Sequence, residues 1–291
     1  MEYNKNKKFL KNLMPKRYEN SNKGTFGHVL NIASSKYYIG AGFFSSISPL
    51  IVGAGRSTLA TTASAISKIG ALSPDIIYLP LEESKNGTIG INATKKIAET
   101  ISNYDVISIG CGLSTDKETT EFFKTVLPII KDIQKPFIVD ADGLNILATM
   151  ENKKLNENAI ITPHPLELSR LLTISVEQIL SKPEFWVEKT AEKFDCTVVL
   201  KLHETLVCSD KLKLYRNTTG NTALSHGGSG DVLCGMISGF LAQGLNPFEA
   251  SCLATYLHGK AGEYASKDLT EYSVTTSKLL DYIPKAIKHL L

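Results

Sequence analysis

Short apolar runs alternate with longer segments of helical periodicity along most of this sequence, and this alternation constrains the fold more than any other feature. Runs that are apolar throughout are typical of strands buried in a parallel sheet, and the intervening segments are long enough to form crossover helices. The pattern therefore predicts an α/β fold. The expected strands are HVLNIA (28–33), GRSTLATT (55–62), DIIYLP (75–80), YDVISIG (104–110), KPFIVDAD (135–142), NAIITP (158–163) and CTVVLK (196–201).

Helical signals occupy several segments between and after these runs. Four helices are expected, at residues 116–130, 143–150, 165–172 and 183–194. Pro165 suits the first position of its helix. Residues 231–243 are too apolar all round for a surface helix, so we expect a buried helix there and another over 247 to about 265. Residues 203–217 instead predict a β-hairpin with a polar turn at 209–211.

The organisation of the chain indicates one domain. Apolar periodicity begins only at His28, so residues 1–22 are expected to form an N-terminal arm that either packs or stays mobile. The sequence contains no internal repeat, low-complexity tract or linker, and its 43% hydrophobic content is enough for a sizeable core. Residues 23–291 are therefore predicted to be a single domain. No signal peptide and no apolar run of the ~20 residues that a membrane span needs is present, which predicts a cytoplasmic protein without a membrane partner.

Charge and cysteine content exclude several classes of partner. The 32 basic and 29 acidic residues give a net charge of +3, too close to balance to predict nucleic-acid binding. The cysteines are widely spaced and include no C-x-x-C pair, so their spacing indicates neither a disulfide framework nor a zinc site. We expect reduced thiols and assign no residue to a metal. The five are Cys111, Cys196, Cys208, Cys234 and Cys252.

A glycine-rich loop at residues 220–230 runs directly into the apolar helix expected from Asp231. Glycines let backbone N–H groups crowd around an anion, and a helix N-terminus adds partial positive charge at the same place, so a phosphoryl group would fit there. The Asp231 carboxylate could then accept a proton from an attacking hydroxyl. The alternative is that Asp231 only caps the helix and that Gly227, Gly228 and Gly230 only make a turn. The length of the loop and the apolar helix favour the catalytic interpretation.

Polar side chains follow three of the expected strands. His164 lies between two prolines at a strand end, where ligands bind in open α/β sheets, although the motif taken alone favours a cap of the next helix. Asp140 and Asp142 end another strand and could orient a metal ion or a substrate hydroxyl, although Asp142 could be only a cap. Lys201 ends a third strand, where it either reaches a nucleotide phosphate or is merely solvated.

Small residues also mark two strand ends, Gly112 after one and Ala41, between two glycines, after another. They would let a bulky ligand approach the backbone, or simply allow tight turns and close packing. No G-x-x-x-x-G-K-[ST] sequence is present, which excludes a P-loop enzyme as far as a motif can.

Seven motifs in one order resemble those of the ADP/ATP-dependent NAD(P)H-hydrate dehydratases, over about Lys23 to Ala265. They are KGTFG (23–27), GAG (40–42), GCG (110–112), DADGLN (140–145), TPHPLE (162–167), LKLHET (200–205) and HGGSGD (226–231). The resemblance implies a ribokinase-like, three-layer α/β/α fold with a central, mostly parallel sheet. It also implies dehydration of the S epimer of NADHX or NADPHX: ADP or ATP, with Mg²⁺, phosphorylates the ring hydroxyl, and loss of phosphate restores NAD(P)H.

The same resemblance implies roles for individual residues. Asp231 resembles the family's catalytic carboxylate. The positions that resemble hydrate contacts are Ala41, Gly112, His164 and Asp231. The positions that resemble nucleotide contacts are Lys201, Leu202, His203, Glu204, Thr205, Gly227, Gly228, Ser229 and Gly230.

Four positions differ from the usual family pattern. Cys111 and Ser114 stand where the family has proline and glycine, which would give the loop more freedom and more bulk, and Leu202 replaces a glycine. Serine at Ser229 replaces an expected threonine but keeps the hydroxyl. The resemblance further implies a homo-oligomer, a tetramer, and a separate NAD(P)HX epimerase as pathway partner, because many relatives carry an N-terminal epimerase domain for which this sequence has no room.

Two alternative functions follow from the same motifs. A ribokinase-like kinase of a vitamin precursor would share the G-x-G-D type of anion site, although TPHPLE and DADGLN argue against it. A nucleotide-sensing module without catalysis would explain the changes at Cys111, Ser114 and Leu202, although Asp231 and its glycine loop are intact.

Overall fold

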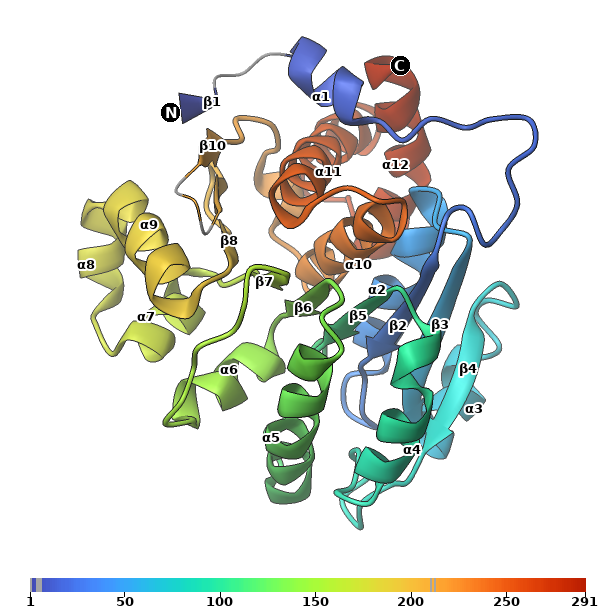
Figure 1. Cartoon of the computed structure of the whole chain (residues 1–291). Helices are drawn as coiled ribbons and strands as arrows, with labels where there is room; N and C mark the ends of the chain where they lie inside the picture. Colours follow the sequence, from blue (N-terminus) through green and yellow to red (C-terminus); the bar gives the residue numbers. More distant parts are fainter. Residues whose placement is uncertain (1, 4–6, 210, 212) are drawn as a thin grey trace.

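The computed structural model describes residues 2–3, 7–209, 211 and 213–291. Within these residues ten strands form one sheet (Figure 1) in the order β1-β10-β9-β8-β7-β6-β5-β2-β3-β4. The strands are β1 (Glu2–Tyr3), β2 (His28–Ile32), β3 (Arg56–Thr62), β4 (Ile77–Leu81), β5 (Val106–Ile109), β6 (Phe137–Val139), β7 (Ala159–Ile161), β8 (Thr197–Leu200), β9 (Leu206–Cys208) and β10 (Leu214–Arg216). Neighbouring strands from β4 across to β8 are parallel, whereas β9 is antiparallel to β8 and β10.

Helices cover both faces of this sheet, so the predicted three-layer α/β/α architecture is confirmed. One face packs on α1 (Lys7–Leu13), α2 (Ile39–Ile51), α3 (Ala63–Ile69), α10 (Ser229–Ala242), α11 (Pro247–Leu269) and α12 (Thr276–Leu290). The other face packs on α4 (Ala93–Thr100), α5 (Lys117–Asp132), α6 (Asp142–Thr149), α7 (Pro165–Leu172), α8 (Val176–Ser181) and α9 (Pro183–Phe194). Figure 1 shows α10 and α11, in orange, on the opposite side of the sheet from α5 and α6, in green. Two separate apolar cores result.

Alternate residues of each strand supply the two cores, as the pleat requires. In β6, Ile138 contributes to the core under α10, whereas Phe137 and Val139 contribute to the core under α5 and α6. All three side chains are fully buried. The continuous apolar runs in the sequence therefore reflect burial on both faces of a parallel sheet.

The register of the parallel strands brings four strand ends to one edge. Ile32 pairs with Ile109, Ile109 with Val139, and Val139 with Ile161, so β2, β5, β6 and β7 end side by side. The residues that follow these strands must meet at the carboxyl edge of the sheet, where open α/β sheets bind ligands.

Most of the expected elements are present. Every expected strand is found, and the helices expected at 165–172 and 183–194 match α7 and α9 at both ends. The hairpin is also confirmed, since β9 and β10 pair antiparallel. Its expected turn at 209–211 includes residue 210, which lies outside the described residues.

Other helix boundaries differ from expectation. α10 begins at Ser229 instead of Asp231, which moves Ser229 and Gly230 from the expected loop into the helix. α11 continues to Leu269, past the expected end near 265. The sequence analysis missed β1, α1, α3, α4, α8 and α12. The helices α1, α3, α4 and α8 are short, so few turns were available to establish a periodicity.

The N-terminal segment packs against the C-terminal helices. Leu10 of α1 is buried at 2% exposure in the core shared with α11 and α12. β1 pairs in parallel with β10, at one edge of the sheet. None of the helices in the described part of the chain combines the length and apolar character required to cross a bilayer.

Glycines on α10 allow α2 to approach unusually closely. A Cβ on Gly235 would lie 2.6 Å from the Ser45 carbonyl oxygen and 2.8 Å from Ser48 Cβ of α2. One turn further along α10, a Cβ on Gly239 would lie 2.5 Å from Val52 Cγ2. An added Cβ at either position would force the two helices apart. The absence of a side chain on Gly235 and Gly239 therefore allows the short distance between α2 and α10.

We expect Gly235→Ala to destabilise the protein by about 1–3 kcal/mol, because overpacking a helix interface costs more than the gain in helix propensity. Urea unfolding followed by circular dichroism measures the change. Gly40→Ala in α2 is the matched control, since its Cβ would meet nothing nearer than a Phe44 ring atom at 3.5 Å. The control should be neutral or stabilising, and equal losses in both variants would contradict the role assigned to Gly235.

Candidate active site

A buried ion pair joins two strand ends at the carboxyl edge of the sheet. Lys201, directly after β8, places its Nζ 2.9 Å from Oδ1 of Asp140, directly after β6. The same Nζ lies 3.8 Å from Oε2 of Glu167 in α7. Burial alone would lower the pKa of Lys201, but the Asp140 and Glu167 carboxylates outweigh it and raise that pKa. Lys201 therefore stays charged inside the protein.

His164 and Glu167 form the start of α7. His164 is the N-cap: its Nδ1 accepts a hydrogen bond from the Glu167 amide, while Oε2 of Glu167 accepts one from the His164 amide. The capping interpretation of His164 is thus correct. Burial raises the pKa of Glu167 to about 7, against the opposing effect of Lys201. His164 Nε2 still lies 3.4 Å from Oε1 of Glu167, and almost half of its side chain is exposed.

Asp231 lies in the first turn of α10 but does not cap it. The N-cap is Gly228, at φ 95°, and no side chain caps this helix. The capping interpretation of Asp231 is therefore wrong. Burial, and then the nearby Asp140 carboxylate, raise the pKa of Asp231 to about 7, while a hydrogen bond from Cys111 and the charge of Lys201 oppose the shift. This carboxyl can accept a proton near neutral pH.

The uncapped N-terminus of α10 lies beside Lys201. A Cβ on Gly230 would be 3.5 Å from Lys201 Nζ, so the backbone of the first turn and the ammonium group approach the same volume. The preceding loop is fixed, because Thr276 of α12 donates a hydrogen bond of 2.8 Å to the Gly227 carbonyl. Backbone N–H groups, helix dipole and ammonium charge together favour an anion here.

A cavity of about 620 Å³ opens in front of this turn. It brings together seven residues singled out from the sequence: His164, Lys201, Leu202, His203, Thr205, Ser229 and Gly230. Glu204 does not line it, because its carboxylate pairs with Arg216 at 3.0 Å. Gly227 and Gly228 also lie outside the lining; at Gly228 a Cβ would be 2.8 Å from the Phe44 ring, which shows how closely this loop packs on α2.

Much of the cavity wall was not recognised from the sequence. The additional lining residues include Asn217, Thr219, Asn221, Thr222, Thr255 and His258. Asn217 and Thr219 directly precede the glycine-rich loop at 220–230, and Asn221 and Thr222 lie at its start, so this polar stretch offered a weak signal. Thr255 and His258 lie within α11, where nothing local marks them. His258 is buried, which lowers its pKa to about 4, and its Nε2 lies 3.2 Å from Ser229 Oγ.

Gly112 and Ala41 lie together, outside the cavity lining. A Cβ on Gly112 would be 2.7 Å from Ala41 Cβ, so the loop after β5 packs directly on the first turn of α2. Gly112 and Ser114 both have positive φ, 65° and 73°. Ser114 thus keeps the left-handed backbone that glycine adopts most readily.

The loop after β5 is held more firmly than its sequence suggested. The Ser34 amide donates to the Cys111 carbonyl at 2.8 Å, and the Ser114 amide donates to Oδ2 of Asp142 at 2.8 Å. Asp142 is the first residue of α6 and Ala141 is its N-cap, so Asp142 serves this loop instead of capping the helix. Cys111 is 1% exposed and fills the core, not the cavity. The added freedom and bulk expected there are not observed.

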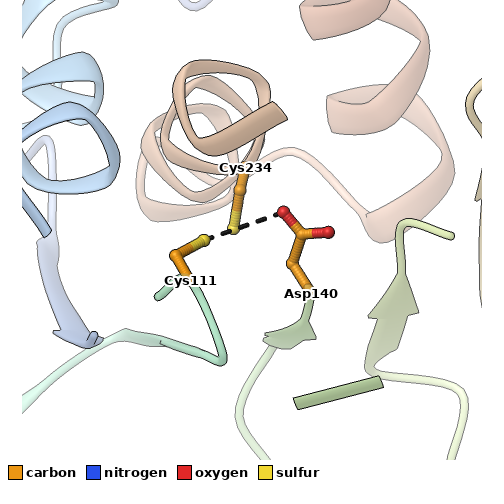
Figure 2. A group of neighbouring side chains, drawn as sticks. All are labelled: Cys111, Asp140 and Cys234. Atoms are coloured by element: carbon orange, nitrogen blue, oxygen red, sulfur yellow. Dashed lines mark hydrogen bonds between the residues drawn. The ribbon is translucent and has the colours of Figure 1, made fainter. Parts of the chain in front are cut away.

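The fold also brings together side chains that lie far apart in the sequence. Cys111, Asp140 and Cys234 each offer a ligand atom, and the three atoms lie within 4.8 Å of one another (Figure 2). Cys111 Sγ is 3.7 Å from Oδ2 of Asp140. Sequence spacing gave no indication of this cluster, because one thiol follows a strand and the other lies on α10.

Comparisons with known proteins agree with this geometry. The family described as NAD(P)H-hydrate dehydratase matches residues 29–285. An ADP-dependent (S)-NAD(P)H-hydrate dehydratase of Neisseria meningitidis is 36% identical over 251 residues, 85% of this chain and 80% of its own. A bifunctional NAD(P)H-hydrate repair enzyme of Thermofilum pendens is 33% identical over 279 residues, and this chain spans about half of it: 95% of this chain aligns with 53% of the relative.

Solved structures lead to the same family. The ADP/ATP-dependent NAD(P)H-hydrate dehydratase of Bacillus subtilis, co-crystallised with ATP and Mg²⁺, superposes with a TM-score of 0.86 at 27% identity, covering 98% of both chains. A hydroxyethylthiazole kinase of Pyrococcus horikoshii superposes with a TM-score of 0.63 at 17% identity, which shows a shared ribokinase-like fold alone. From the match over residues 29–285 and the identity to these relatives, the chain belongs to the NAD(P)H-hydrate dehydratase family.

Proposed function

We propose that this protein dehydrates the S epimer of NADHX and NADPHX back to NADH and NADPH at the expense of ADP or ATP. The observation that carries the proposal is the placement of Asp231, a carboxyl with a pKa of about 7, in the uncapped first turn of α10 beside Lys201. Asp231 can accept a proton while Lys201 and the backbone of the first turn of α10 hold a phosphoryl group. The names of the relatives supply the substrate class.

In this mechanism the Asp231 carboxylate takes the proton from the ring hydroxyl of the hydrate as the hydroxyl oxygen attacks the terminal phosphoryl group of the nucleotide. The nucleotide is released with one phosphate group fewer. Backbone N–H groups of residues 227–230 and the Lys201 ammonium stabilise the charge on the transferred group. Departure of phosphate, with loss of a ring proton, then restores the carbon–carbon double bond of the nicotinamide.

The nucleotide and the hydrate would occupy different parts of the site. The nucleotide would lie along Lys201, Leu202, His203 and Thr205, which line the cavity, with its phosphates at Ser229 and Gly230. The hydrate would contact His164 and Asp231, together with the backbone of Ala41 and Gly112, which pack on each other. Glu204 would act only indirectly, through Arg216.

The family implies Mg²⁺ as well as the nucleotide. The carboxyls of Glu167 and Asp231 both interact with Lys201 and supply the oxygen ligands that this ion prefers. The residues therefore fit a magnesium ion that arrives with the nucleotide, and the ion would neutralise phosphate charge. The homotetramer, a cytoplasmic location and a separate epimerase stay predictions of the resemblance.

We expect the purified protein to regenerate NADH absorbance from NADHX only when ADP or ATP and Mg²⁺ are present. Asp231→Asn should lower kcat by about 10³-fold or more, because it removes the proton acceptor for the attacking hydroxyl. Asp195→Asn is the matched control: the same chemical change at a half-exposed position outside the cavity lining, which should leave kcat unchanged. Near-normal turnover by Asp231→Asn would contradict the mechanism. If the wild-type protein gave a stable phosphorylated product, it would be a kinase. If it bound the nucleotide without turnover, it would be a sensor.

The pH dependence follows from the pKa of Asp231. Because the deprotonated form accepts the proton, kcat/KM should fall about tenfold per pH unit below about 7. Glu167 has a pKa in the same range, so the profile is also measured in Glu167→Gln. We expect that variant to be slower but to keep the acidic limb. Loss of the limb in Glu167→Gln would assign the proton transfer to Glu167.

Asp231→Asn should also stabilise the fold at neutral pH. The folded state raises the pKa of Asp231 above its ordinary value of 3.8, so wild-type stability is lost as pH rises from 3.8 to about 7, while the unfolded chain ionises first. At pH 8 the free energy of unfolding of the variant should exceed that of the wild type by about 1–2 kcal/mol, a modest gain because partial exposure screens the charge of Asp231. Near pH 4 the two proteins should be almost equally stable, because Asp231 is protonated in the folded wild type. Urea midpoints at both pH values measure the difference, and a gain equal at both would contradict it.

A further inference from the structure

Two thiols and a carboxylate converge in the core behind the proposed active site. Cys111 comes from the loop after β5, Asp140 from the end of β6, and Cys234 from α10 (Figure 2). All three side chains are buried, at 1% exposure each. The proposed dehydration needs neither thiol, so the mechanism leaves this cluster without a role.

The distances suit a tetrahedral cation. Ligand atoms of a zinc ion with bonds of 2.0–2.3 Å stand about 3.5–3.8 Å apart. Cys111 Sγ and Oδ2 of Asp140 are already 3.7 Å apart, and the three ligand atoms lie within 4.8 Å of one another. Only small side-chain movements would close the remaining gap. Thiolate sulfur and carboxylate oxygen are together a ligand set for zinc, not for magnesium.

Asp231 lies next to the cluster, although it is not one of the three residues whose ligand atoms lie within 4.8 Å of one another. Asp231 precedes Cys234 by three residues on α10, so both side chains project from the same face of the helix. Asp231 is also close enough to Cys111 for the thiol to oppose the rise in its pKa. Because Asp231 is only partly buried, it links the cluster to the solvent side.

A positive charge beside the cluster would offset part of its negative charge. Each thiol releases its proton to solvent as a sulfur–metal bond forms, so a divalent ion with two thiolates and the Asp140 and Asp231 carboxylates would carry a net charge of −2. The Lys201 ammonium, 2.9 Å from Oδ1 of Asp140, would reduce this net charge to −1. Burial raises the pKa of both thiols, so without a metal they stay protonated and neutral.

We propose that Cys111, Cys234 and Asp140 form a zinc-class metal site, with Asp231 as fourth ligand, and that occupancy of this site blocks the active site. A bound ion would occupy the Asp231 carboxylate, which then could not accept a proton from substrate. The site is therefore inhibitory, not structural or catalytic.

Metal binding is tested without substrate, so that its outcome does not depend on the proposed reaction. Metal-free protein, reduced with a phosphine, is titrated with Co²⁺, and the thiolate-to-cobalt charge-transfer absorbance is followed. We expect one cobalt per chain, release of two protons, and displacement by Zn²⁺. Cys234→Ala and Cys111→Ala should weaken binding at least tenfold, whereas Cys252→Ala, which removes a buried thiol outside the cluster, should bind as the wild type does.

The functional arm measures NADH recovery with and without Zn²⁺. Zinc should inhibit the wild type and Cys252→Ala, a chelator should restore them, and Cys234→Ala should stay active and insensitive. Urea midpoints confirm that the variants are folded. Absence of the charge-transfer band, both on incubation and on refolding with Co²⁺, would overturn the proposal, as would an equal band in Cys234→Ala. Inactivation that peroxide causes and a thiol reverses, without cobalt binding, would show that the two cysteines form a disulfide instead.

Discussion

The ion pair between Lys201 and Asp140 is the interaction on which the arrangement of the site depends. It joins the ends of β6 and β8 across β7, in a position where burial alone would lower the pKa of Lys201. Buried charge of this kind gives little net stability, but removing one partner leaves the other uncompensated. The pair therefore fixes the position of the ammonium group in front of α10. It also determines the field that Asp231 and Glu167 experience.

Three carboxyls around one ammonium cannot all be ionised comfortably in a buried site. Asp140 holds the short contact with Lys201, and the two more distant carboxyls, Glu167 and Asp231, have their pKa values raised to about 7. The site is thus a set of acids separated by their environments, which is the usual way in which a fold obtains a base near neutral pH. Destabilisation of the charged Asp231 is the cost of that reactivity.

Close backbone packing holds these groups in place. Gly110 approaches so near to Asp140 that a Cβ would lie 1.9 Å from its carbonyl oxygen, and Ala141, the next residue, adopts a φ of 50°. Gly235 and Gly239 bring α10 onto α2 in the same way. The loop after β5 therefore packs directly on the loop after β6, and a cation bound among Cys111, Asp140 and Cys234 would join both loops to α10.

The sequence by itself determined the layers, the strands and the motifs. Burial on both faces leaves continuous apolar runs in the central strands β5, β6, β7 and β8. A proline marks the start of both α7 and α9. The sequence also indicated Asp231, Lys201 and His164, since each stands beside a strand end or helix start. Short helices such as α3 and α8 escaped because they hold too few turns to show a period.

Tertiary structure alone decided which of these residues meet. Whether Asp231 caps a helix or stands free depended on a helix start two residues earlier, at Ser229, which no local signal distinguished. The Lys201–Asp140 pair, the wall contributed by Thr255 and His258, and the Cys111–Cys234 cluster all join residues from different elements. Sequence patterns record how each segment is buried, whereas proximity between segments follows from strand order and register, which only the folded sheet fixes.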